Sequence, residues 1–227
     1  MNVLVVAAHP DDEVLGCGAT IAKLAREGAN VHIAILGEGI TSRHADPADA
    51  DPAELEDLHR HAREAAKLLG AKGISLHHLP DNRFDTVPLL EVVKTVEALA
   101  TKHKPEIIYT HHGGDLNIDH QITFRAVLTA TRSFPGQSVR EVLSFEVSSS
   151  TDWTFHKMEP VFRPNVFVDV TSMLELKLHA MERYESETRE FPHPRSRQAL
   201  EAIARRWGSV AGFAAAEAFE LVRSLRT

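Results

Sequence analysis

The chain has 227 residues, of which 43% are hydrophobic and 25% are charged, as in ordinary globular proteins. This length suits one sizeable core and is short for two, so we expect a single domain over residues 1–227. The formal net charge of −7 offers no basic excess to neutralise phosphates, which argues against nucleic acid and against an anionic membrane surface as partners.

The start of the chain and its cysteine usage suggest a compartment. The N-terminus passes directly into an apolar strand pattern, without the basic segment and longer apolar region of a secretory leader. The first apolar run is also too short to span a bilayer. Cys17 is the single cysteine and has no internal disulfide partner, which fits a reducing environment. We therefore expect a cytoplasmic protein that acts on a small molecule and does not bind membranes.

Strand-like and helix-like segments alternate through the first part of the chain. Apolar runs typical of buried strands occupy residues 3–8, 31–36, 74–79 and 106–110. Helical patterns follow them at residues 19–27, 53–69, 89–100 and 121–131. Because helical crossovers between strands make parallel, right-handed connections, this order predicts an α/β fold. We expect a Rossmann-like three-layer sandwich with a mostly parallel sheet and helices on both faces.

The remainder of the chain is less regular. We predict strands at residues 141–148 and 165–170, and helices at 172–184 and 196–225. Three polar stretches read as loops, at residues 39–52, 80–85 and 191–195, and the last contains two prolines that exclude a regular helix.

Two polar clusters follow predicted strands, and the carboxyl ends of such strands are where open α/β sheets bind ligands. The first contains His9, Asp11 and Asp12, and the second contains Asp119 and His120. Two imidazoles and one carboxylate, from His9, His120 and Asp12, can bind zinc and leave a position for water. Asp11 then remains free as a base. The alternative for Asp11, Asp12 and Glu13 is that they complement the dipole of a helix or cap its first turn.

These residues resemble a known family. Ala8-His9-Pro10-Asp11-Asp12-Glu13, followed by Gly16 and Gly18-Ala19-Thr20-Ile21, resembles the opening motif of the PIG-L/LmbE-like zinc-dependent N-deacetylases. Asn117-Ile118-Asp119-His120 resembles their second motif. The resemblance implies that His9, Asp12 and His120 bind Zn²⁺, that Asp11 is the general base, and that the enzyme removes an acetyl group from an amino sugar or its conjugate. Family members are often homo-oligomers, so a homo-oligomer is one expectation.

The chain departs from this family at Asn117. Many members carry a His there, which is thought to stabilise the oxyanion or protonate the leaving amine. The Asn117 side-chain NH₂ offers a donor to the oxyanion instead. Zinc would polarise the amide carbonyl and lower the pKa of its bound water to about 7, so that Asp11 takes the proton as water attacks. Asp119 is expected to orient a nearby imidazole, to cap the helix that starts at His120, or to combine both roles, which is the interpretation we favour.

Four further residues are candidates for substrate binding. Arg43 and Arg83 stand in strand-end loops and could pair with a phosphate, carboxylate or sugar hydroxyl. His193 and Arg195 lie in the proline-containing loop, where His193 could supply the acid missing at Asn117. The alternative for Arg43 and Arg83 is a solvated surface arginine. His111 and His112 end the fourth strand, either lining the pocket or lying on the surface.

Three other functions stay open. The first is a metal-dependent amide hydrolase that acts on a non-sugar acetylated amine. The second is an Fe(II) enzyme with the same two-histidine, one-carboxylate set. The third is a nucleotide-binding α/β protein without deacetylase activity, in which Gly16-Cys17-Gly18 holds phosphate at a helix start. That stretch lacks the third glycine of the dinucleotide motif, and the acids at residues 11–13 would repel a pyrophosphate.

Overall fold

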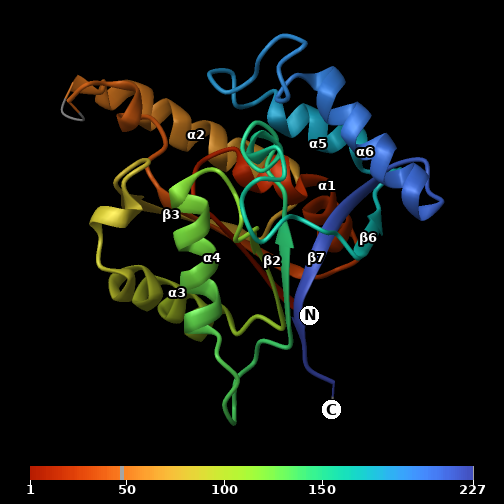
Figure 1. Ribbon diagram of the computed structural model, residues 1–227, viewed down its shortest axis with the longest axis horizontal. Coiled ribbons are helices and arrows are strands. Elements are labelled where there is room, and N and C mark those ends of the chain that lie inside the picture. Colours follow the sequence, from red (N-terminus) through yellow and green to blue (C-terminus); the bar gives the residue numbers. More distant parts are fainter. Residues whose placement is uncertain (47–48, 227) are drawn as a thin grey trace.

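The structure is a computed structural model that describes residues 1–46 and 49–226 (Figure 1). Residues 47 and 48 of the predicted loop 39–52 lie outside this part. The described strands form one seven-stranded sheet in the order β3-β2-β1-β4-β5-β7-β6. The first five strands pair in parallel, whereas β7 runs antiparallel to both of its neighbours. The strands are β1 (Asn2–Ala7), β2 (Asn30–Gly37), β3 (Gly73–Leu79), β4 (Ile107–His111), β5 (Glu141–Phe145), β6 (Val166–Asp169) and β7 (Ala216–Ser224).

Helices cover both faces of this sheet, which confirms the predicted three-layer α/β architecture. Val3 and Val5 of β1 pack on one face with α1, α2, α5 and α6, and Leu4 and Val6 pack on the other with α3 and α4. No helix in the described residues is both long enough and apolar enough to cross a membrane. The helices are α1 (Asp12–Arg26), α2 (Pro52–Leu68), α3 (Leu89–His103), α4 (Ile118–Ala130), α5 (Leu174–Met181) and α6 (Arg197–Ala211). Short 3₁₀ turns occupy Thr41–Arg43, Phe84–Thr86 and Asp152–Thr154.

The strand order places a crevice beside β1. From β1 the chain moves outward through β2 and β3, and then returns to pair β4 with the other edge of β1. The connections leaving β1 and β4 therefore diverge at their carboxyl ends, which is the usual ligand position in such sheets. Both polar clusters follow these two strands, His9 after β1 and His120 after β4.

The first helix begins earlier than predicted, at Asp12 rather than residue 19. Gly16-Cys17-Gly18 lies inside it, where Cys17 has φ −148° and interrupts the regular helix. A Cβ at Gly16 would lie 2.2 Å from an atom of the Phe145 ring, so this glycine permits close packing of the helix on β5. The stretch is therefore not a phosphate-holding loop at a helix start, and the nucleotide-binding hypothesis loses its structural basis.

The predicted helix 196–225 was wrong in its second half. Helix α6 ends at Ala211 and is capped by Gly212, which adopts φ +80°, and the chain returns as β7 between β5 and β6. Alanine and glutamate in Ala215-Ala216-Glu217-Ala218 favour helix, but strand pairing and burial override that local preference. Glu217 is buried against Lys177, with a 2.7 Å contact between Oε1 and Nζ, and accepts the Ala19 and Thr20 backbone N–H groups beyond the interruption in α1.

Candidate metal centre and active site

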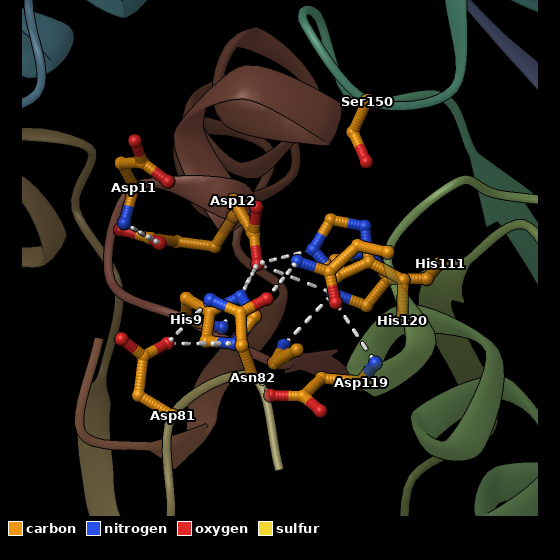
Figure 2. Close-up of polar contacts among 12 residues, drawn as sticks. His9, Asp11, Asp12, Asp81, Asn82, His111, Asp119, His120 and Ser150 are labelled. Atoms are coloured by element: carbon orange, nitrogen blue, oxygen red, sulfur yellow. Dashed lines mark hydrogen bonds and ion pairs between the residues drawn. The ribbon is translucent and has the colours of Figure 1, made fainter. Parts of the chain in front are cut away.

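His9, Asp12 and His120 converge at the carboxyl ends of β1 and β4. One ligand atom from each lies within 4.8 Å of the others. Asp12 Oδ2 is 3.4 Å from His9 Nδ1 and 3.2 Å from His120 Nε2. Figure 2 shows the Asp12 carboxylate between the His9 ring and the stacked rings of His111 and His120. The structure therefore brings together the three residues that the sequence singled out as ligands.

The donor set of this cluster fits a divalent cation. His120 Nε2 is buried 3.2 Å from Asp12 Oδ2, but this contact lacks the geometry of a hydrogen bond, so both atoms can turn to a cation held between them. The surrounding carboxylates also attract positive charge. Burial disfavours protonation of His9, but Asp119 and Asp12 outweigh it and raise the pKa of His9 to about 10. Two imidazole nitrogens and one carboxylate oxygen form a set that suits zinc.

Asp119 lies behind His9. Its Oδ2 is 2.9 Å from His9 Nε2, and its Oδ1 accepts the Phe84 backbone N–H at 2.9 Å. A carboxylate on the far nitrogen of an imidazole fixes the ring and leaves the other nitrogen for a metal. Asp119 is not the helix cap, since α4 begins after Asn117, whose Oδ1 accepts the Asp119 backbone N–H at 2.8 Å. His9, Asp81 and Asp119 also lie within 4.8 Å of one another, but His9 Nε2 is already engaged by Asp119.

Asp115, which was not among the predicted site residues, plays the same part for His120. Its Oδ1 lies 3.0 Å from His120 Nδ1, and its two oxygens accept the hydroxyls of Ser150 and Thr151. Burial would raise its pKa, but the charge on His120 and these hydrogen bonds outweigh it and lower the pKa to about 2. The feature of the sequence that could have indicated this role is the position of Asp115 in the second polar cluster, five residues before His120. Ser150 and Thr151 lie in the connection after β5, where no sequence pattern indicates a site residue.

We expect Asp115→Asn to weaken zinc binding by about 10–100-fold, the usual effect of losing a carboxylate that orients a metal-binding histidine. The amide retains one acceptor oxygen but loses the charge that holds His120 in place. Competition with a chromophoric chelator measures this affinity. Asp85→Asn, a substitution at an exposed aspartate outside the cavity, is the matched control. Equal zinc affinity in both variants would contradict the role given to Asp115.

His111 and His112 are buried, so the surface alternative for them was wrong. The His111 ring stacks on that of His120 with 3.9 Å between centroids, and its Nε2 accepts the Ala8 backbone N–H at 2.8 Å. Burial and the neighbouring His120 lower the pKa of His111 to about 3. The neutral His111 ring therefore packs against the His120 ring and helps to fix its orientation.

Asp11 lies on the other side of the cluster and is held by Arg195. Asp11 is 2% exposed, and Arg195 Nη1 donates to its Oδ2 at 2.6 Å. Arg195 Nε also donates to Ser149 Oγ at 2.8 Å. Burial raises the pKa of Asp11 well above its usual range, and the Arg195 guanidinium opposes that effect. Asp11 is therefore a carboxylate beside the cluster, with its own cationic partner.

The metal-site cluster of His9, Asp12 and His120 lines a cavity of about 170 Å³, together with Asp11 and Arg195. Its far wall is a hydrogen-bonded set of short polar side chains, of which only Asn117 was predicted to be a site residue. Asp81 Oδ2 accepts the Ser42 hydroxyl at 2.6 Å, and Asn82 Nδ2 donates to Ser42 Oγ at 2.9 Å. Asn117 Nδ2 donates to Asn82 Oδ1 at 2.8 Å, so this residue both caps α4 and closes the wall. The cavity therefore offers many hydrogen-bonding groups and little apolar surface.

The structure places the four predicted substrate-binding residues differently. Arg43 and Arg195 line the cavity, and both lie against Glu187, Arg43 Nη2 at 2.5 Å and Arg195 Nη1 at 3.5 Å from its carboxylate oxygens. Arg83 is exposed and does not line the cavity. His193 is also absent from the lining and packs against Trp153, with 5.7 Å between ring centroids. Its Nδ1 accepts the Arg195 backbone N–H at 3.1 Å.

The fold and this site define an α/β protein with a two-histidine, one-carboxylate centre and an adjacent acidic side chain. The family model described as PIG-L, GlcNAc-PI de-N-acetylase, matches residues 4–131, and the chain belongs to this family. It is similar to an uncharacterized deacetylase, YaiS, of Escherichia coli K12, with 28% identity covering 82% of this chain and 91% of that protein. It is also similar to the diacetylchitobiose deacetylase of Thermococcus kodakarensis, with 26% identity covering 97% of this chain and 83% of that protein.

Among solved structures, the chain resembles the 4-carboxy-2-hydroxymuconate hydratase GalB of Pseudomonas putida KT2440. The TM-score is 0.78 at 20% identity, and the match covers all of this chain and 98% of the other. This likeness shows the fold alone. Because that protein is described as a hydratase, the fold does not by itself decide the reaction, which must be argued from the site.

Proposed function

We propose that this protein is a zinc-dependent hydrolase that removes the N-acetyl group from an amino sugar or its conjugate. The observation that carries the proposal is the position of Asp11, a buried carboxylate that faces the same polar cavity as the cluster of His9, Asp12 and His120. Membership of the PIG-L family and similarity to a diacetylchitobiose deacetylase support the same reaction and substrate class.

His9, Asp12 and His120 would hold the zinc ion, with Asp119 and Asp115 orienting the two imidazoles. Zinc bound there would polarise the amide carbonyl and lower the pKa of a water molecule to about 7. The same three residues suit Fe(II), but amide hydrolysis needs no redox chemistry, so zinc is the simpler choice.

Asp11 would act as both general base and general acid. Its carboxylate takes a proton from the attacking water and returns that proton to the departing amine nitrogen. The only histidines among the described residues that line the cavity are His9 and His120, both assigned to the metal. Within the described lining of the cavity, no free imidazole replaces the histidine that many family members carry at Asn117. The second N–H of the Asn117 amide remains available to donate to the oxyanion or to a sugar hydroxyl.

The cavity favours a neutral sugar over an anionic one. Its two arginines, Arg43 and Arg195, are paired with Glu187 and Asp11, so neither offers an unpaired charge to a carboxylate or phosphate. Asp81 adds a further acidic group to the wall. A volume of about 170 Å³ is below the roughly 300–1,000 Å³ typical of ligand pockets, so it suits one sugar ring with the rest of a conjugate outside.

A substrate panel tests this proposal directly. The zinc-loaded protein is incubated with N-acetylglucosamine, diacetylchitobiose, an anionic N-acetylglucosaminide and an N-acetylated alkylamine, and released amine and acetate are measured together. We expect equal amounts of both products, with the highest kcat/KM on a neutral sugar. Exclusive activity on the alkylamine would support the non-sugar alternative. Turnover that requires Fe(II) and oxygen, or the absence of hydrolysis of every compound, would contradict the proposal.

A further inference from the structure

Glu13 is a fully buried carboxylate that follows the metal-binding motif and contacts none of the three proposed ligands through its own oxygens. Its Oε2 accepts the backbone N–H of Asp11 at 3.2 Å, and its Oε1 accepts the hydroxyl of Tyr184 at 2.6 Å. Burial raises the pKa of Glu13 to about 7, and the Tyr184 hydrogen bond opposes that effect. The two hydrogen bonds thus join Tyr184 to the backbone of Asp11 through one side chain.

The backbone of Asp11 needs such support. Its φ of 101° and ψ of −28° fall in a region that residues with a Cβ rarely adopt. Asp11 precedes α1 as the N-cap, yet its side chain makes no capping hydrogen bond and instead reaches Arg195. Strained residues of this kind persist only where their surroundings fix them, and they concentrate at functional sites. The hydrogen bond from the Asp11 N–H to Glu13 is part of what holds this conformation.

Tyr184 comes from a distant part of the chain. It lies between α5 and α6, is fully buried, and stands outside residues 4–131, which the family model matches. Its carbonyl accepts the backbone N–H groups of Glu187 and Thr188 at 2.9 and 3.0 Å, which fixes the turn that carries Glu187. Glu187 in turn lies against Arg195, the partner of the Asp11 carboxylate. The same segment therefore supports Asp11 at its backbone and at its side chain.

We infer that Tyr184 is a positioning residue for the general base, acting through Glu13 to hold Asp11 in the turn that directs its carboxylate into the cavity. This inference rests on the proposed function for its catalytic consequence. The hydrogen bonds among Tyr184, Glu13 and Asp11 do not depend on the proposed function and can be measured separately.

Tyr184→Phe tests the inference because it removes one hydroxyl and keeps the ring. Small displacements of catalytic groups cost up to about 100-fold in rate, so we expect kcat to fall by about 10–100-fold. KM and zinc content should stay close to those of the wild type. The matched control is Tyr109→Phe. Tyr109 is the other tyrosine of the chain, and its ring is buried on β4 against Phe219. Removal of its hydroxyl should leave kcat unchanged.

Two substitutions at Glu13 separate positioning from packing. Glu13→Gln keeps an oxygen for the Asp11 N–H and places an NH₂ group against the Tyr184 oxygen, so it should recover much of the kcat that Glu13→Ala loses. Amide hydrogen exchange gives a readout that does not depend on activity. The Asp11 N–H should exchange faster in Tyr184→Phe than in Tyr109→Phe.

The outcomes distinguish the inference from the proposed function. A folded Tyr184→Phe variant with wild-type kcat and wild-type exchange at Asp11 would overturn the inference while deacetylation by the wild type stands. Parallel losses of kcat, zinc and thermal midpoint would also overturn it, because they would mark a purely structural role. A wild-type protein that hydrolyses no acetamide would overturn the proposed function and the catalytic part of the inference, whereas the exchange experiment would still test the hydrogen bonds.

Discussion

Asp11→Asn should lower kcat by about 10²–10⁴-fold while zinc remains bound, because general acid–base catalysis contributes rate factors of this size. The substitution keeps the shape of the side chain and an oxygen that can accept from Arg195. It removes only the capacity to take a proton from water and return it to the amine. Steady-state kinetics on the best substrate of the panel, with zinc content by elemental analysis, measures both quantities.

Asp85→Asn is the matched control for this experiment, since Asp85 is exposed and lies outside the cavity. Full activity in Asp11→Asn with zinc bound would show that Asp11 is not the base. Loss of zinc from Asp11→Asn would show that Asp11 belongs to the ligand set rather than to the proton transfer. Neither result would change the assignment of Asp12 as a proposed metal ligand.

Asp12→Ala should weaken zinc binding by more than about 100-fold, beyond the effect expected for the carboxylates that only orient the histidines. Asp12 Oδ2 is the central atom of the cluster, close to both His9 and His120, and no other carboxylate oxygen in the described residues faces both rings. Activity should disappear with the metal. Chelation of the wild type should have the same effect, and added zinc should restore only the wild type.

Asp12→Asn separates ligation from folding. Asp12 Oδ2 also accepts the His9 backbone N–H at 2.8 Å, and an asparagine oxygen can still do so. We expect this variant to keep the thermal midpoint of the wild type better than Asp12→Ala and still to bind zinc poorly. Normal zinc stoichiometry in both variants would mean that the ion is held elsewhere.

The layout of the fold and the candidate metal ligands could be predicted from the sequence. Alternating strand and helix patterns predict a parallel sheet because their periodicity is local, and the strand-end rule then brings His9, Asp12 and His120 to one edge without knowledge of any contact. The same local reasoning failed at β7, where residues with high helix propensity form a strand because a place between β5 and β6 buries them. Asn117 likewise has a role, capping α4, that its motif position did not reveal.

The surroundings of the proposed ligands could not be predicted, because they are contributed by distant segments of the chain. Arg195 reaches Asp11 across 184 positions of sequence, and Tyr184 reaches Glu13 across 171. Ser150 and Thr151 reach Asp115 in the same way, from a connection with no recognisable pattern. No spacing rule encodes such pairs, because each depends on how separate segments pack over the sheet. The sequence thus predicts the groups that we propose to hold the metal and to move the proton, and the packing of the later chain decides how those groups are held.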